Sequence, residues 1–278
     1  MTTTGRLEGK ICLITGGIRG FGASIVSLFV SQGAKCLVLD LLVAQPGFYN
    51  PYTIESPSSS SSTTSTCSPT LSPPNNSAYA IKADITSRNS WQEALAQSKK
   101  VFGDIPTIII NNAGWTYSNK PTLQVQQDEF DKVFNINVKS IYLSVDVLLP
   151  ELLKENNGQD AVFVNVSSTA AIRPRPGLVW CAVSTATKAL AVEYAPNKIR
   201  FNTVCPVAGN TPLLSKFAGS KEAGDEMSSE KLAQFNASIP IGRLSQGKDI
   251  ANACLFLADP QSCFITGVEL PVDGGRCV

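Results

Sequence analysis

A glycine-rich turn between an apolar run and a helical pattern constrains the fold of this chain more than any other feature. Ile11 to Ile14 form a short apolar run, which is typical of a buried strand. The turn Thr15-Gly16-Gly17-Ile18-Arg19-Gly20-Phe21-Gly22 follows at once, and helical spacing of apolar residues then continues over 20–32. Glycine permits a tight turn and a close approach of the backbone to a phosphate, and a helix N-terminus supplies N–H donors. Strand, turn and helix together predict a dinucleotide site.

Apolar runs and helical patterns continue to alternate along the chain. Further strands are predicted at 36–39, 79–81, 107–110, 162–165, 201–204 and 268–272. Helical patterns lie near 88–102, 126–154, 182–195 and 247–258. Apolar strands that alternate with helices are typical of a parallel sheet covered on both faces. The predicted fold class is therefore α/β, a doubly wound parallel sheet of Rossmann-like type, in one domain over residues 1–278.

One segment, about residues 44–77, interrupts this alternation. It contains an unbroken serine run, Ser58 to Ser62, followed by Thr63, Thr64 and Ser65. A stretch of this composition cannot bury enough apolar surface to offset the entropy that it would lose on ordering. We expect a disordered loop inserted between the second and third strands, and we favour a tolerated insertion over a phosphorylation site.

The composition excludes several classes of chemistry. The chain has no histidine, which removes Ser-His-Asp and Cys-His catalysis and histidine metal sites. The cysteines never form Cys-x-x-Cys and most lie in apolar runs, so we expect buried thiols and no metal site. A formal net charge of +1 gives no field that favours nucleic acid or an anionic membrane. Because the N-terminus is polar and no apolar run approaches the roughly 20 residues that span a bilayer, we expect a cytoplasmic protein.

Motifs in a fixed order carry a resemblance to a known family. The turn reads Thr-Gly-x-x-x-Gly-x-Gly, and the run Asn111-Asn112-Ala113-Gly114 follows the fourth strand. Asn137-Val138-Lys139-Ser140, Val166-Ser167-Ser168 and Asp273-Gly274-Gly275 come next along the chain. This pattern resembles the short-chain dehydrogenases/reductases, in particular fungal-type members, over residues 7–278 apart from the serine-rich insertion. The resemblance implies an oxidoreductase of secondary metabolism that transfers hydride between NAD(P)(H) and a ketone or secondary alcohol. It also implies a small-molecule substrate and a homo-oligomer.

The resemblance assigns a set of cofactor contacts, two of which affect the choice between NAD and NADP. Asp40 ends the second strand, where a carboxylate accepts hydrogen bonds from both ribose hydroxyls and repels a 2′-phosphate. Arg19 is the kind of residue that pairs with that phosphate in NADP-preferring relatives. We favour NAD because the repulsion by Asp40 acts directly at the ribose, and NADP stays open. The full set is Gly16, Ile18, Arg19, Gly20, Phe21, Gly22, Asp40, Asp84, Ile85, Asn112, Ala113, Gly114, Gly209 and Thr211.

The catalytic residues that the resemblance implies are only partly present. Ser168 would polarise the substrate oxygen, and Asn137 would orient a water relay. Tyrosine should follow that serine by about thirteen residues, with lysine four later, because a phenol of pKa near 10 needs a nearby cation. Cys181 and Thr185 occupy these two positions. Roughly five residues are also missing before Pro206, about 1.4 helical turns, so we interpret the change as a deletion of the Tyr-x-x-x-Lys segment.

Three groups could substitute for the missing pair. Tyr194 and Lys198 match Tyr-x-x-x-Lys literally, but Pro196 would break the helix that must align them. Cys181 could relay a proton, although a packed thiol is favoured, and Lys188 could reach the ribose, although a surface lysine is favoured. Three interpretations follow: an oxidoreductase with a compromised active site, a catalytically inactive NAD(P)-binding pseudoenzyme, or a non-functional splice or gene-model variant.

The substrate side of the site offers fewer signals. Residues 212–240 carry glycines and many charges and resemble the mobile lid that closes over substrate in relatives. Arg173 and Arg175 flank the expected mouth of the site, where they would favour an acidic or phenolic substrate. Solvated surface arginines are the favoured interpretation of this pair.

Overall fold

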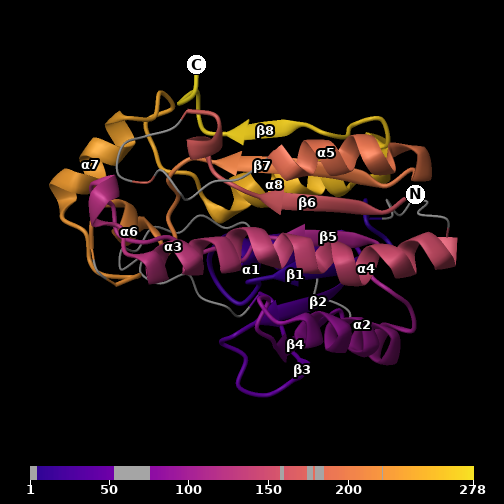
Figure 1. Ribbon diagram of the computed structural model, residues 1–278. Helices are drawn as coiled ribbons and strands as arrows, with labels where there is room; N and C mark the ends of the chain where they lie inside the picture. The colour runs from indigo at the N-terminus through magenta and orange to yellow at the C-terminus, as the bar shows by residue number, and fades with distance from the viewer. Residues whose placement is uncertain (1–4, 53–75, 157–159, 174–177, 179–184, 221) are drawn as a thin grey trace.

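A single twisted sheet with helices on both faces forms the molecule in the computed structural model (Figure 1). The structure describes residues 5–52, 76–156, 160–173, 178, 185–220 and 222–278. In this part of the chain the sheet has eight strands, and their order is β3-β4-β2-β1-β5-β6-β7-β8. The strands are β1 (Ile11–Thr15), β2 (Lys35–Asp40), β3 (Gly47–Phe48), β4 (Ala78–Lys82), β5 (Ile108–Asn111), β6 (Val162–Val166), β7 (Arg200–Pro206) and β8 (Glu269–Val272). Every neighbouring pair is parallel except β3 with β4.

The helices form two layers and one further group. One face of the sheet carries α1 (Gly20–Ser31) and α8 (Gly247–Ala258), and the other carries α2 (Arg88–Phe102), α4 (Ser140–Asn156) and α5 (Thr185–Tyr194). Three short helices gather beyond the carboxyl ends of the strands, at the left of Figure 1: α3 (Gln127–Phe134), α6 (Leu214–Phe217) and α7 (Ser229–Ala237). Short 3₁₀ turns occur at Thr122–Gln124, Thr169–Ala171, Ala195–Asn197 and Pro260–Ser262. None of the helices in the described part is long and apolar enough to cross a membrane.

Burial on both faces explains why the strands read as continuous apolar runs. Successive residues of one strand point to opposite faces. Cys12 and Ile14 of β1 therefore pack in the core under α1 and α8, whereas Leu13 packs in the core under α2 and α4. The second core also holds a stacked pair, Phe163 and Phe201 on adjacent strands, with ring centroids 4.6 Å apart. The sheet is thus sealed on both sides, and ligands can approach it only at its ends.

The structure confirms the predicted fold class and differs from the predicted elements in three places. The pattern at 126–154 is not one helix, because a π-helical turn at Asn135–Lys139 separates α3 from α4. The range 44–77 is not uniform, since Gly47 and Phe48 form β3, while 53–75 lie outside the described residues. The 212–240 segment contains α6 and α7, which the sequence did not indicate. Of the predicted helix at 182–195, the structure describes α5 at Thr185–Tyr194, and 182–184 lie outside the described residues. Most of the other boundaries lie within two residues of those predicted.

Candidate functional site

The glycine turn between β1 and α1 is shaped by contacts that only glycine allows. Gly16 and Gly20 have φ of +67° and +58°, in the left-handed region that other residues rarely adopt. A Cβ on Gly22 would lie 2.0 Å from the carbonyl oxygen of Gly16 and 2.6 Å from Nδ2 of Asn112. Arg19 occupies the N-cap position of α1, but its side chain makes no capping hydrogen bond. The N–H groups of the first helical turn are therefore available to an anion. The turn therefore forms a cradle that fits a pyrophosphate.

A second motif, Asn111 to Gly114 at the end of the neighbouring strand β5, is hydrogen-bonded to this turn. Thr15 Oγ1 accepts hydrogen bonds from the N–H groups of Asn112 and Ala113, both at 3.0 Å. In return, Nδ2 of Asn112 donates to the carbonyl oxygens of Thr15 and Gly16, at 2.9 and 3.1 Å. The structure thus brings together two of the motifs that the sequence assigned to the cofactor, although 96 residues separate Asn112 from Gly16.

Acidic side chains stand at the ends of the two strands beside the turn. Asp40 ends β2, and its carboxylate accepts the N–H groups of Ile18 at 3.1 Å and Leu42 at 3.0 Å. Asp84 follows β4, and its Oδ1 accepts from the N–H and the hydroxyl of Thr86. Asp40 is therefore held against the glycine turn, at the end of the strand where the sequence predicts a ribose contact. Arg19 and Asp84 are exposed, whereas the Ile85 side chain is buried.

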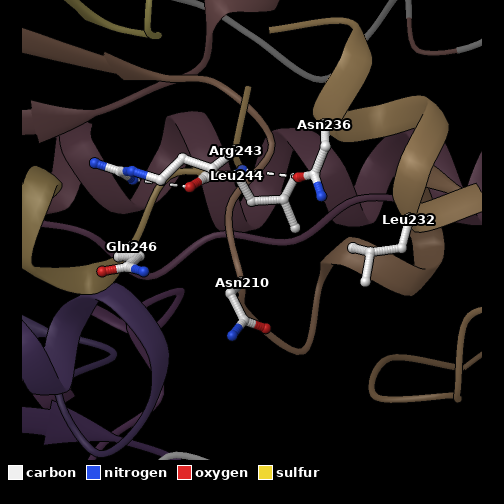
Figure 2. Close-up of a pocket in the computed structure, with 6 residues that line it drawn as sticks. All are labelled: Asn210, Leu232, Asn236, Arg243, Leu244 and Gln246. Atoms are coloured by element: carbon white, nitrogen blue, oxygen red, sulfur yellow. Dashed lines mark hydrogen bonds between the residues drawn. The ribbon is translucent and has the colours of Figure 1, made fainter. Parts of the chain in front are cut away.

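The motif after β7 reaches the same cradle from the other side. A Cβ on Gly209 would lie 2.2 Å from the ring of Phe21, so α1 and this loop are in close contact. Thr211 lies beside Gly20, with its Cγ2 3.6 Å from the point where a Cβ of Gly20 would stand. Next to this loop is a hollow of about 240 Å³ (Figure 2), lined by Asn210, Leu232, Asn236, Arg243, Leu244 and Gln246. Figure 2 shows Asn210 facing this hollow from the loop, with Leu232 on the neighbouring helix α7.

Asn137 lies in the π-helical turn and holds the backbone of Trp115. Its Oδ1 accepts from the N–H of Trp115 and its Nδ2 donates to the Trp115 carbonyl oxygen, both at 2.9 Å. A Cβ on Gly114 would lie 3.6 Å from the same Oδ1. The wide turn therefore aims Asn137 at the loop that follows the Asn-Asn-Ala-Gly motif, as expected where a π-turn occurs at a functional position. Sequence reasoning did not single out Trp115, although it directly follows that motif.

Ser168 lies at the same carboxyl end of the sheet, two residues after the end of β6. Its Oγ accepts the N–H of Ala170 at 3.1 Å and caps the short turn Thr169–Ala171. The Ser168 backbone also contacts the thiol of Cys205. Burial, with smaller contributions from Glu269 and Cys277, raises the pKa of Cys205 to about 12. Cys205 is therefore a packed, protonated thiol beside the candidate catalytic serine.

Of the candidate substitutes for the missing pair, Lys188 is held in an ion pair, and Tyr194 with Lys198 lies away from Ser168. Lys188 Nζ lies 2.7 Å from Oε2 of Glu269, an ion pair that ties α5 to β8. Tyr194 and Lys198 precede the start of β7, whereas Ser168 follows the end of its parallel neighbour β6, so they lie at opposite ends of the sheet. The ring of Tyr194 packs near Phe201, with centroids 6.1 Å apart.

The positions of the expected tyrosine and lysine are occupied by Cys181 and Thr185. Cys181, which holds the expected tyrosine position, lies outside the described residues, and the exposed Thr185 begins α5. Among the described residues, the structure contains no group of three or more acidic, cysteine or histidine side chains that could hold a metal ion. Of the catalytic residues that the sequence predicts, Ser168 and Asn137 lie in the described part of the chain.

Comparisons with known proteins place this geometry in a family. A family model described as enoyl-(acyl carrier protein) reductase matches residues 61–276. The chain is 34% identical over 275 residues to a 4-formylbenzenesulfonate dehydrogenase from Comamonas testosteroni, covering 97% of this chain and 98% of the relative. It is 30% identical over 285 residues to a 2,5-dichloro-2,5-cyclohexadiene-1,4-diol dehydrogenase from Sphingobium indicum, covering 98% of each.

Solved structures agree with these relatives. A 3-ketoacyl-(acyl-carrier-protein) reductase from Brucella melitensis, complexed with NADH, superposes with a TM-score of 0.79 and 36% identity. The match covers 98% of this chain and 100% of that one. A short-chain dehydrogenase/reductase from the same organism shares the fold at 23% identity, with a TM-score of 0.76 and coverage of 99% of each chain. With its sheet order, its glycine cradle and these relatives, the chain belongs to the short-chain dehydrogenase/reductase family of NAD(P)-dependent oxidoreductases.

Proposed function

We propose that this protein binds NAD(H) in the glycine cradle and that its hydride transfer is severely impaired. The observation that carries the proposal is a contrast between the two ends of the site. At the cofactor end, contacts that exclude a Cβ at Gly22 and Gly209 form a close-fitting cradle. At the catalytic end, the sequence has Cys181 and Thr185 where relatives are expected to carry tyrosine and lysine.

The residues of the cradle fit the parts of a dinucleotide. The N–H groups at the start of α1 suit the pyrophosphate, and the carboxylate of Asp40 suits the adenosine ribose. In the proposed complex, Asp84 and Ile85 would contact the adenine, and Gly209 and Thr211 would complete the cofactor site from the loop after β7. When bound, the nicotinamide supplies or accepts the hydride. Ser168 would then hold the substrate oxygen by a hydrogen bond from its hydroxyl.

The proton transfer that accompanies hydride transfer has lost its expected donor. A phenol works at neutral pH only with a cation close by, and general acid catalysis of this kind contributes roughly 10²–10⁴-fold to the rate. Lys188 is engaged by Glu269, and the pair Tyr194 and Lys198 lies at the far end of the sheet. These contacts support the interpretation that no described side chain replaces the missing segment.

We infer the substrate class from the relatives and the fold. Two relatives are named for ring compounds, an aromatic aldehyde and a cyclic diol. A ring-bearing ketone or secondary alcohol is therefore the proposed substrate of residual turnover, in a homo-oligomer of the cytoplasm. A catalytically inactive NAD(P)-binding pseudoenzyme is the second candidate, favoured by the residues at positions 181 and 185.

A binding measurement paired with a turnover measurement tests the proposal. NADH is titrated into the purified protein while nicotinamide fluorescence is followed, and NADH oxidation is then measured with a panel of aromatic and cyclic carbonyls. We expect saturable NADH binding together with turnover at least a hundredfold below the typical value of about 10 per second. Turnover at ordinary rates would contradict the proposal, and complete lack of turnover with intact binding would favour the pseudoenzyme.

Cofactor preference depends on Asp40. In the Asp40→Ala variant we expect NADH to bind about tenfold more weakly, because the ribose loses a charged acceptor. NADPH should bind more tightly than to the unmodified protein, because the repulsion of its 2′-phosphate is removed. The two dissociation constants are measured by the same titration. Asp104→Ala, at an exposed position before β5, is the matched control and should change neither constant. Equal NADH affinity in the Asp40 variant would show that this carboxylate does not contact the ribose.

A further inference from the structure

Trp91 is the largest completely buried side chain among the described residues, and its indole N–H is bonded outside its own helix. Its Nε1 donates to the carbonyl oxygen of Ile85 at 2.9 Å. A buried indole N–H usually finds such an acceptor, because leaving it without one is costly. The acceptor here lies in the loop that the proposed function gives to the adenine, so this bond can affect cofactor recognition.

The helix α2 holds Trp91 in a fixed place beneath this loop. Trp91 lies on the inner face of α2 with Ala94 and Ser98, which are also buried. α2 packs against β2 and α4 (Figure 1), and an ion pair between Arg88 and Asp146 ties its first turn to α4. The indole is therefore a fixed donor, and the backbone of the loop before α2 is oriented by it.

The loop between β4 and α2 is attached to the core at Ile85. The Ile85 side chain is 8% exposed and belongs to the same core cluster as Trp91. A peptide group is planar, so the carbonyl of Ile85 and the N–H of Thr86 point in opposite directions. Because the indole holds the carbonyl oxygen, it also sets the direction of the Thr86 N–H.

Thr86 passes this constraint to the carboxylate of Asp84. The Thr86 N–H donates to Oδ1 of Asp84 at 2.9 Å, and the Thr86 hydroxyl donates to the same oxygen at 2.8 Å. These two bonds hold the carboxylate and do not use Oδ2. Asp84 is exposed, so its Oδ2 can accept a hydrogen bond from a ligand. The indole, the Ile85–Thr86 peptide and the carboxylate thus form one chain of contacts from the core to the surface.

This carboxylate lies close in the sheet to the candidate ribose contact, Asp40. Asp40 and Lys82 are register partners on the parallel strands β2 and β4. The N–H of Ala83 donates to the Asp40 carbonyl oxygen at 3.2 Å, and the Asp40 carboxylate accepts the N–H of Ile18 in the glycine turn. Asp40 and Asp84 therefore lie at the same end of neighbouring strands, as the ribose and the base of one nucleoside require.

We propose that Trp91 is a positioning residue for the adenine site. Its bond to Ile85 orients Asp84 so that Oδ2 accepts the exocyclic amino group of adenine. Hypoxanthine carries a carbonyl oxygen in place of that amino group, and an ionised carboxylate accepts hydrogen bonds but cannot donate them. The site therefore selects adenine over hypoxanthine, and the selection depends on the indole. This inference rests on the proposed function, because it needs a nucleotide in the glycine cradle.

Nucleotide pairs that differ only at the base amino group test the proposal without requiring turnover. NADH and its deamino analogue, in which hypoxanthine replaces adenine, are titrated by nicotinamide fluorescence, and ADP and IDP are titrated by calorimetry. We expect the unmodified protein to bind each adenine compound about tenfold more tightly, as is usual for a hydrogen bond to a charged group. In Trp91→Phe this ratio should fall to about twofold, because Asp84 is no longer held in place. Affinity for the hypoxanthine compounds should change much less.

A second substitution controls for the loss of packing. Phe163→Leu removes volume from the same core cluster, on β6, which is not adjacent to β4 in the sheet. Both variants should unfold at a lower temperature than the unmodified protein, because both remove buried atoms. Phe163→Leu should nevertheless keep the full preference for adenine. A Trp91→Phe protein that also keeps this preference would overturn the proposal, in favour of a packing role.

A double variant shows whether Trp91 acts through Asp84. Asp84→Ala should itself lower the ratio to about twofold, and adding Trp91→Phe should lower it no further, because both changes remove the same contact. Ratios that fall independently in the two variants would contradict the proposal, as would equal affinity for the two bases in the unmodified protein. If NADH does not bind, the proposed function fails, and ADP and IDP still decide whether Trp91 supports recognition of the base. Absence of ADP binding as well would overturn both.

Discussion

Replacing Gly22 with alanine should weaken NADH binding by at least a hundredfold. The added Cβ would lie 2.0 Å from the Gly16 carbonyl oxygen and 2.6 Å from Nδ2 of Asn112, both of which are fixed by other bonds. The turn must open to relieve this overlap, which also lowers the free energy of unfolding by about 1–3 kcal/mol. NADH titration and thermal unfolding measure the two effects.

The matched control is Gly47→Ala. A Cβ at Gly47 meets no heavy atom within 4 Å, so the same chemical change costs no overlap there. We expect this variant to bind NADH with unchanged affinity and to unfold at an unchanged temperature, within error. Normal NADH affinity in the Gly22 variant would show that the cofactor does not lie against the turn.

Insertion of Tyr-Asn-Ala-Ser-Lys after Trp180 should raise turnover by roughly 10²–10⁴-fold, the usual contribution of a positioned general acid. The insertion returns both missing groups and about 1.4 turns of helix, so that the phenol and the ammonium can share a helical face. Rates of NADH oxidation with the aromatic and cyclic carbonyl panel give the measurement. NADH affinity should stay close to that of the unmodified protein, because the glycine cradle is unchanged.

A second insertion separates chemistry from helix length. The same five residues with phenylalanine in place of tyrosine restore the length but no proton donor, and we expect them to leave turnover at its low level. An equal gain from both insertions would mean that helix length alone limits the rate. No gain from the tyrosine insertion would contradict the interpretation that a deleted segment explains the impaired catalysis.

Much of the fold could be predicted because a parallel sheet buried on both faces leaves a plain pattern. Strands such as β1 read as unbroken apolar runs, and α2 was predicted with the boundaries that it has in the structure. The π-helical turn at Asn135–Lys139 could not be predicted in this way, because apolar spacing continues through it while the hydrogen bonds shift by one residue. The two residues of β3 were too few to show a period.

In the candidate site, too, the parts built from consecutive residues could be predicted, and the parts built from residues far apart in the sequence could not. The glycine turn is local, so its strand, turn and helix could be predicted from consecutive residues. The ion pair between Lys188 and Glu269 joins residues 81 positions apart, and no local pattern indicates it. Trp115 was missed for a similar reason, since its place depends on Asn137, 22 residues away.

The π-helical turn at Asn135–Lys139 also lets α3 and α4 face different parts of the molecule. Each residue of an α-helix turns it by about 100°, so one extra residue in a turn lets the helices before and after it face different directions. α4 keeps Leu148 and Leu152 in the core, while α3 places Nζ of Lys132 4.6 Å from the ring centroid of Trp115, directly after the Asn-Asn-Ala-Gly motif. Substitutions on α3 can therefore change the surroundings of the Asn-Asn-Ala-Gly motif while the packing of α4 stays intact. We expect relatives that differ in substrate to differ at this short helix before they differ in the core beneath it.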